Sequence, residues 1–358
     1  MDRSVMQDTG ALRVVAFGGG TGLPVLLRGL RQTGVKRISA VVTVADDGGS
    51  SGRLRQELGV APPGDLRKCL LALADWQRLA EVFEYRFEGG VELHDHSVGN
   101  IIITALADIS GDLCEGVNQA GRFLRITGRV LPAATESVTL VIHGADGSVT
   151  RGESTVREAG QAVKRITVEP ATAQAPRAVI DAIDNADIAV LSPGSLFTST
   201  IPALLGGGVP ETLARFSGPV IYVANIMTQP GETVGFTLSD HVRAIREHVG
   251  PVITDVLVHR SPLPAPLLAR YSAEGAAPVV IDRAQVERLG VKLHCARLLP
   301  DRASREIRHE PGRLAQAVYR VGASRQSLIN RPVIARQSRQ PAPRRGVARA
   351  PASRAPQA

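Results

Sequence analysis

The feature that most constrains the fold is a cluster of glycines between two apolar stretches. Residues 12–17 form a short β-rich run, and residues 23–31 have the spacing of a helix. The cluster between them consists of Gly18, Gly19, Gly20, Thr21 and Gly22. A second β-branched run follows at residues 38–44. A strand, a glycine turn, a helix and another strand predict an α/β fold with a mostly parallel sheet.

The glycine cluster has the composition of a phosphate-binding turn. Glycine lets the backbone approach a phosphate closely, and a helix N-terminus offers free N–H groups and a positive dipole end. Leu23 stands where a complete dinucleotide fingerprint has its third glycine. A tight turn without a ligand would use the same residues, but the position between a strand and a helix favours phosphate binding.

A polar stretch at residues 45–53, expected to be a loop, follows the second strand. Asp46 and Asp47 stand where a dinucleotide fold bonds a ribose hydroxyl, and paired carboxylates can also hold Mg²⁺ against phosphate oxygens. Asp65 either caps the next helix or joins an acidic cluster, so Asp47 and Asp65 are candidate Mg²⁺ ligands. A solvated loop would have the same composition. The stretch continues with residues that can accept an anion: Gly48, Gly49, Ser50 and Ser51.

Further elements are predicted along the chain. Residues 65–124 are mostly helical, and 99–109 form an apolar helix that we expect to be buried. A hairpin is expected over residues 137–152. Further strands and one short helix are predicted at 164–168, 176–183 (the helix), 188–191, 219–224 and 254–259.

Polar residues follow several of these elements. Ser97 or His96 is expected to cap a helix whose Gly99 and Asn100 touch a ligand; hydrolase and metal interpretations of this segment are weaker, because His94 and His96 supply only two ligands. Gly194 and Ser195 follow a buried strand and open either a second anion-binding helix or an ordinary capped turn. Asn225 and Thr228 follow another strand. Because the carboxyl ends of parallel strands line one crevice, we expect one shared site for Gly20, Asp46, Ser195 and Asn225.

Composition limits the remaining possibilities. The eight arginines from Arg325 onward equal the net charge of +8, so the rest of the chain is formally neutral and does not predict specific nucleic-acid binding. We expect a disordered lead-in at residues 1–10, one domain at 11–324 and a disordered basic tail at 325–358. Three scattered cysteines and the lack of a membrane span or signal peptide indicate a cytoplasmic protein.

The glycine turn and the string at residues 44–55 resemble the gluconeogenesis factor (YvcK-like) family. The resemblance covers residues 12–320 in order, and the ADDGGSSGRLR string is long and uncommon. Lys68 and Cys69 depart from the pattern, because an asparagine is expected early in that helix. The other departures are Ser192, Ala203 and Glu310. The match continues in the segments 62–67, 96–100, 193–199, 225–229 and 307–309.

The resemblance implies both a fold and a ligand. Family members are similar in fold to 2-phospho-L-lactate transferase (CofD-like), a Rossmann-like protein. For this chain the resemblance implies a mostly parallel sheet with flanking helices and a helical and hairpin insertion. They bind uridine-diphosphate sugars such as UDP-N-acetylglucosamine, and NAD can occupy the same cleft. The resemblance places the glycine turn, Asp46, Asp47, Gly194, Ser195 and Asn225 in that cleft, with Arg308 as a basic ligand-binding position.

The resulting interpretation is a cytoplasmic regulatory protein that binds UDP-N-acetylglucosamine and requires no cofactor. The resemblance implies a role in cell shape and cell-wall synthesis during gluconeogenic growth, exerted through protein partners in envelope synthesis. A homodimer is compatible with this interpretation. The alternative is a Mg²⁺-dependent transferase of phosphorus-containing groups. An NAD-dependent oxidoreductase is less well supported, since no catalytic His or Tyr-Lys arrangement is evident.

Overall fold

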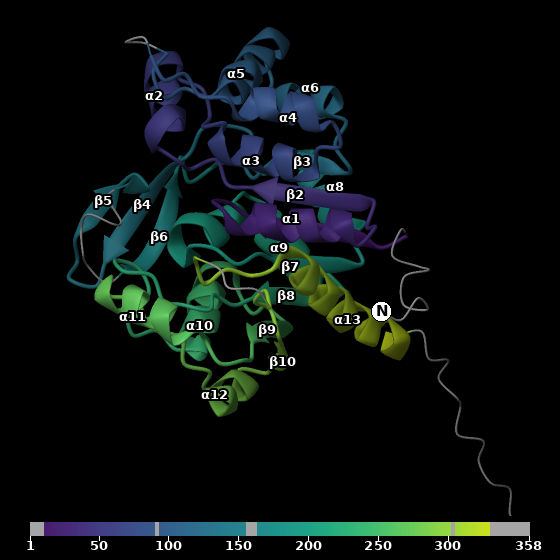
Figure 1. The fold of residues 1–358 in the computed structure, drawn as a ribbon, viewed down its shortest axis with the longest axis vertical. Coiled ribbons are helices and arrows are strands. Elements are labelled where there is room, and N and C mark those ends of the chain that lie inside the picture. Colours follow the sequence, from purple (N-terminus) through teal and green to yellow (C-terminus); the bar gives the residue numbers. More distant parts are fainter. Residues whose placement is uncertain (1–10, 90–92, 155–162, 302–304, 330–358) are drawn as a thin grey trace, which may run out of the picture.

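The centre of the molecule is a seven-stranded parallel sheet (Figure 1). A computed structural model describes residues 11–89, 93–154, 163–301 and 305–329. The strand order is β10-β9-β8-β7-β1-β2-β3. The bounds of the strands are β1 (Arg13–Gly18), β2 (Arg37–Val42), β3 (Arg129–Pro132), β7 (Ile188–Leu191), β8 (Val220–Val223), β9 (Asp255–His259) and β10 (Lys292–Ala296). The predicted α/β class is confirmed.

The order of the strands creates a switch point beside β1. From β1 the chain runs to β2 and β3 on one side, while β7, β8, β9 and β10 continue on the other side. Residues of β7 and β8 are buried throughout, as expected for strands covered by helices on both faces. Loops that leave β1 and β7 diverge at this point, which opens a crevice at the carboxyl ends of the strands.

Helices flank the sheet. Helix α1 packs against both α3 and α13 (Figure 1). Five buried apolar side chains of α1, including Leu23 and Leu26, form the apolar face that holds it on the core. The bounds of the flanking helices are α1 (Gly22–Gln32), α3 (Gly64–Leu73), α8 (Arg177–Asp184), α9 (Val209–Arg215), α10 (Leu238–Val249), α11 (Ala265–Ala273), α12 (Arg283–Arg288) and α13 (Pro311–Ile329).

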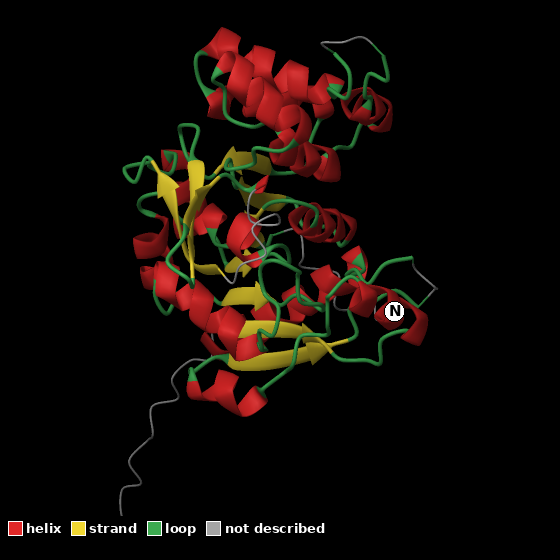
Figure 2. Cartoon of the chain, turned by 90° about the vertical axis from the view of Figure 1, so that its left-hand side faces the viewer, coloured by secondary structure: helices red, strands yellow, loops and turns green. Residues whose placement is uncertain are grey.

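Two insertions extend the sheet layers, as the sequence predicts. One is a group of helices between β2 and β3, gathered at the top of Figures 1 and 2. It contains α2 (Gly49–Leu58), α4 (Gln77–Glu84), α5 (Val98–Ser110) and α6 (Leu113–Leu124). The other is a small antiparallel sheet in the order β5-β4-β6. Its strands are β4 (Thr139–Gly144), β5 (Val149–Arg151) and β6 (Val163–Glu169).

Three local predictions differ from the structure. The stretch expected to be a loop at residues 45–53 becomes helical from Gly49, because α2 buries Ser50 and Ser51 against neighbouring elements. Helix α5 is only partly buried, and Ile109 on its outer side is 80% exposed. The helix expected after Ser195 is a five-residue π-helical turn, η2 (Leu196–Thr200), followed by a 3₁₀ turn, η3 (Pro202–Leu204).

The chain ends bear on the expected domain boundaries. Helix α13 continues to Ile329 and so passes the expected boundary at residue 325. The expected lead-in at residues 1–10 and the tail from residue 330 lie outside the described residues. Within the described part of the chain, no helix combines the length and apolar character that a bilayer crossing needs.

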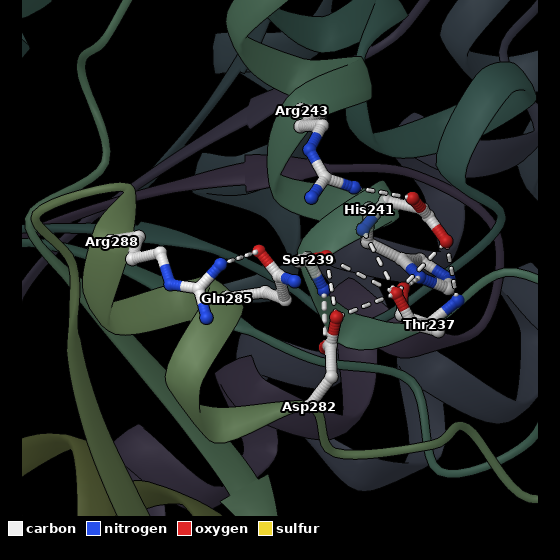
Figure 3. A network of polar contacts seen from close by, with 8 residues as sticks. Thr237, Ser239, His241, Arg243, Asp282, Gln285 and Arg288 are labelled. Carbon is white, nitrogen blue, oxygen red and sulfur yellow. Dashed lines mark hydrogen bonds and ion pairs between the residues drawn. The ribbon is translucent and has the colours of Figure 1, made fainter.

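A polar network fixes the start of α10 (Figure 3). The carboxylate of Asp282 accepts hydrogen bonds from the backbone N–H of Ser239 at 2.9 Å and from the hydroxyl of Thr237 at 3.0 Å. Thr237 and Asp240 form a capping box at the same helix end. The network ties the start of α10 to Asp282, directly before α12.

Candidate functional site

A cleft of about 430 Å³ lies at the carboxyl ends of β1, β7 and β8. The loops that follow these strands supply its walls, together with residues from α3 and α11. Gly20, Asp46, Ser195 and Asn225, which the sequence analysis assigns to one site, all line it. Thr21, Gly22, Gly194, Thr228 and Arg308 line it as well.

The glycine turn is shaped by close contact with the loop after β7. A Cβ atom on Gly22 would lie 1.6 Å from the carbonyl oxygen of Pro193, so no side chain fits there. Gly20 has a φ of +58°, which favours glycine. Gly18 and Gly19 do not line the cleft; a Cβ on Gly19 would lie 2.7 Å from an oxygen of Asp65.

Asp65 joins α3 to the glycine turn. It is only 6% exposed, and its Oδ2 accepts a hydrogen bond from the backbone N–H of Gly20 at 2.5 Å. Its Oδ1 lies 2.9 Å from Nζ of Lys68, one turn further along α3. The N-cap of α3 is Pro63, so the capping interpretation of Asp65 is wrong. Lys68 also lines the cleft, and the sequence analysis noted it only as a departure from the family pattern.

Asp46 and Asp47 do not act as a pair. Asp46 lines the cleft, and its Oδ1 accepts a hydrogen bond from the N–H of Gly48 at 3.0 Å. Burial raises the pKa of Asp46, and the nearby charge of Asp65 adds to the rise. Asp47 does not line the cleft: its Oδ1 accepts a hydrogen bond from the N–H of Ser154 at 2.9 Å. Asp47 thus lies outside the lining of the cleft, and its expected contact with a nucleotide stays a prediction.

The other residues of this region form a neighbouring cavity, also of about 430 Å³, which shares Asp46 and Lys68 with the cleft. Asn100 donates to the hydroxyl of Ser50 at 3.0 Å, and its Oδ1 accepts from Nε of Arg67 at 3.0 Å. These bonds tie α2, α3 and α5 together. The predicted site residues found here rather than in the cleft are Gly48, Gly49, Ser50, Ser51 and Asn100.

Gly99 and Ser97 have structural roles in α5. A Cβ on Gly99 would lie 2.7 Å from the side chain of Arg67 and from the carbonyl oxygen of Phe83, so Gly99 allows close packing and does not touch the cleft. Ser97 caps α5, since its hydroxyl accepts a hydrogen bond from the N–H of Asn100 at 3.3 Å. The expected ligand contact of Gly99 receives no support from its position.

The loop after β7 is held by two side chains from the loop after β8. The hydroxyl of Ser195 donates to Oε1 of Glu232 at 2.7 Å, and these residues are 8% and 4% exposed. The side-chain amide of Asn225 donates to the carbonyl oxygen of Gly194 at 2.6 Å and accepts from its N–H at 3.0 Å. Ser195 also caps the turn at Thr198, as one interpretation of the sequence predicted. Sequence reasoning missed Glu232.

Glu153 is a second cleft residue that sequence reasoning missed. It follows β5 in the small antiparallel sheet, and it lines the cleft beside Asp46, Asp65 and Thr198. Burial raises the pKa of Glu153 to about 8, and the charges of Asp46 and Asp65 contribute to the rise. No sequence signal marks it, because only the folding of the insertion brings it to the cleft.

The opposite wall carries Thr228, Arg308 and His309. The hydroxyl of Thr228 accepts a hydrogen bond from the N–H of Ala277 at 2.9 Å. The exposed guanidinium of Arg308 forms an ion pair with Glu306. Burial lowers the pKa of His309 to about 4, and the neighbouring His259 contributes. His309 is therefore neutral at physiological pH.

The candidate metal ligands do not form a metal site. Within residues 11–89, 93–154, 163–301 and 305–329, no three His, Cys, Asp or Glu side chains group in a way that could hold a metal ion. Each carboxylate oxygen of Asp65 has a donor of its own, and Asp47 is engaged by Ser154. The residues present therefore do not fit a Mg²⁺ ion held by Asp47 and Asp65.

The parallel sheet and the cleft at its switch point define a Rossmann-like α/β protein. Residues 14–299 match the family model described as 2-phospho-L-lactate transferase CofD. The chain is 45% identical over 282 residues to the gluconeogenesis factor of Halalkalibacterium halodurans, covering 78% of this chain and 87% of that protein. It is 44% identical to the gluconeogenesis factor of Bacillus subtilis over 283 residues, covering 78% and 89%.

A solved structure gives the same result. The crystal structure of a protein of the UPF0052 family from Bacillus halodurans superposes with a TM-score of 0.82 at 41% identity, covering 86% of this chain and 98% of that chain. The chain belongs to the gluconeogenesis factor family, within the broader group that the CofD family model describes.

Proposed function

We propose that the cleft binds a uridine-diphosphate sugar, UDP-N-acetylglucosamine, and that the protein acts by binding rather than by chemistry. The observation that carries the proposal is the meeting of two glycine-containing loops, after β1 and β7, at the switch point of the sheet. This is where open α/β sheets bind nucleotides. A cavity of about 430 Å³ lies within the usual range for small-molecule sites.

The polar groups suit the parts of such a ligand. The positive dipole end of α1, which starts at Gly22, favours a diphosphate beside the glycine turn, while the N–H of Gly20 already donates to Asp65. Arg308 on the opposite wall can contact phosphate oxygens through two N–H groups. Asp46 follows β2, where a carboxylate accepts from ribose hydroxyls. NAD carries the same ribose and diphosphate groups and is a competitor for the cleft.

The regulatory part of the proposal rests on α11. None of its residues is buried, yet Tyr271 at its C-terminal half and Glu274 directly after it line the cleft. An element held by few buried contacts can shift when a ligand fills the space beneath it. The relatives carry the name gluconeogenesis factor. We therefore propose that ligand occupancy changes the surface offered to cytoplasmic protein partners in envelope synthesis, and so affects cell shape.

The transferase alternative receives less support from the site. A Mg²⁺-dependent mechanism needs carboxylates free to bind the ion, whereas those of Asp65 and Asp47 already have donors. Binding without turnover requires only the glycine turn and the opposite wall.

Calorimetric titration with UDP-N-acetylglucosamine, NAD and GDP, with and without Mg²⁺, tests the proposal. We expect the UDP-sugar to bind most tightly and to remain chemically intact. Arg308→Ala should weaken binding about tenfold, which corresponds to about 1.4 kcal/mol, whereas Arg305→Ala on the exposed loop nearby should have no effect. Absence of binding at millimolar UDP-sugar, or Mg²⁺-dependent consumption of the nucleotide, would refute the proposal.

A further inference from the structure

We infer that Lys68 is a built-in cation of the cleft, which takes the position of a divalent metal among the carboxylates and makes ligand binding independent of metal. The inference builds on the proposed nucleotide-sugar function. Its central observation is the contact between the ammonium of Lys68 and Oδ1 of Asp65 at 2.9 Å.

The side chain of Lys68 is 39% exposed, and its place in the cleft wall is what distinguishes it from other ion-pair partners at the surface. It lines both the cleft and the neighbouring cavity, so its side chain stands in the wall that the two share. Asp65, its partner, is buried and is bonded through Oδ2 to the turn that we expect to hold the phosphates. The Asp65 carboxylate thus connects the ammonium of Lys68 to the N–H of Gly20.

The charge balance of the cleft favours a cation on the side of the glycine turn, opposite Arg308. Among the described residues that line it, only Lys68 and Arg308 carry a fixed positive charge. Arg308 is already paired with Glu306. An anionic diphosphate would be repelled by the acidic wall unless a cation lay close to it. The acidic residues that line the cleft are Asp46, Asp65, Glu153 and Glu274, of which Glu153, with its pKa raised to about 8 by burial, is mostly protonated at neutral pH.

Lys68 remains charged in this position. Burial lowers the pKa of its ammonium, but the charge and the hydrogen bond of Asp65 outweigh burial, and the charge of Asp46 adds to their effect. The net result is a raised pKa. A divalent ion would have to displace this ammonium from Asp65 before it could bind there.

The first test measures the binding of Mn²⁺ to the full chain in the absence of nucleotide. Electron paramagnetic resonance detects the bound ion. We expect no cleft-bound Mn²⁺ in the wild type and at least about tenfold tighter Mn²⁺ binding in Lys68→Gln. The double variant Lys68→Gln/Asp65→Asn should lose that gain, and Lys68→Arg should behave as wild type. Lys36→Gln, which removes an exposed lysine outside the cleft, is the matched control.

The second test measures the affinity for UDP-N-acetylglucosamine in EDTA and in excess Mg²⁺. Wild-type affinity should be the same in both, whereas Lys68→Gln should lose about tenfold in EDTA and recover part of it with Mg²⁺. Cleft-bound Mn²⁺ in the wild type, or a Lys68→Gln variant that gains no Mn²⁺ site, would overturn the inference. If the wild type bound no UDP-sugar, the proposed function would fail while the Mn²⁺ titration would still decide the role of Lys68.

Discussion

Asp65 and Gly20 are joined by a hydrogen bond of 2.5 Å between the carboxylate Oδ2 and the backbone N–H. The bond links α3, in the segment between β2 and β3, to the turn that follows β1. A buried carboxylate thereby positions the backbone of the glycine turn. The shape of the glycine turn depends on a side chain 45 residues away in the sequence.

Replacement of Asp65 by Asn should therefore affect both stability and binding. The variant loses the negative charge that Lys68 and the Gly20 N–H share, and the partly exposed ammonium of Lys68 is left without its partner. We expect the free energy of unfolding in urea to fall by about 1–3 kcal/mol and the affinity for UDP-N-acetylglucosamine to fall about tenfold. Asp108→Asn, on the exposed side of α5, is the control and should change neither. Wild-type affinity in Asp65→Asn would contradict this account of the turn.

Gly22→Ala tests the contact between the loops after β1 and β7. The added Cβ would lie 1.6 Å from the carbonyl oxygen of Pro193, so the backbone of one loop must move. Overpacking of this kind costs about 1–3 kcal/mol. Thermal denaturation and a UDP-sugar titration should show lower stability and weaker binding. Gly89→Ala is a suitable comparison, since nothing lies within 4 Å of an added Cβ there; equal stability of the two variants would argue against a tight contact.

The raised pKa of Glu153 predicts a pH-dependent stability. Its pKa is about 8 in the folded protein against an ordinary value of 4.5, so the folded state holds an extra proton between these values. Stability should fall as the pH rises through this window. Glu153→Gln is permanently neutral at this position. At about pH 9 its free energy of unfolding in urea should exceed that of the wild type by about 1–3 kcal/mol. At about pH 5 the difference between the two free energies should be smaller. Exposed Glu136→Gln serves as control, and a pH profile shared by Glu153→Gln and wild type would refute the prediction.

The lowered pKa of His309 predicts a loss of stability at acidic pH. Its folded-state pKa of about 4 lies below the ordinary 6.5, so the unfolded chain takes up a proton first as the pH falls. Stability should decrease between about pH 6.5 and pH 4. His309→Gln should reduce this decrease by about 1–2 kcal/mol in urea titrations. His94→Gln, at an exposed position, should leave the profile unchanged; an unaltered profile in His309→Gln would mean that His309 is not a buried neutral imidazole.

The local parts of the fold could be predicted from the sequence. The strands β1 and β2 and helix α1 lie within two residues of their expected bounds, because each has an apolar pattern of the right period. The meeting of Gly20, Asp46, Ser195 and Asn225 followed from the rule that parallel strands end at one edge.

The remaining site residues depended on long-range folding. Glu153 and Glu232 come from an insertion and a loop whose positions no local pattern specifies. Helix α2 was missed because Gly, Ser and Asp favour turns, while burial of Ser50 and Ser51 decides its conformation. The ion pair between Asp65 and Lys68 could have been predicted from the sequence, since residues three apart on a helix lie on one face.

Hydrogen–deuterium exchange of the full chain with and without UDP-N-acetylglucosamine tests the central claim most directly. The account predicts slower exchange at the three loops that form the cleft, at residues 18–22, 193–199 and 225–229. Protection confined to other segments, or unchanged exchange at saturating UDP-sugar, would contradict the claim that this cleft binds the nucleotide sugar.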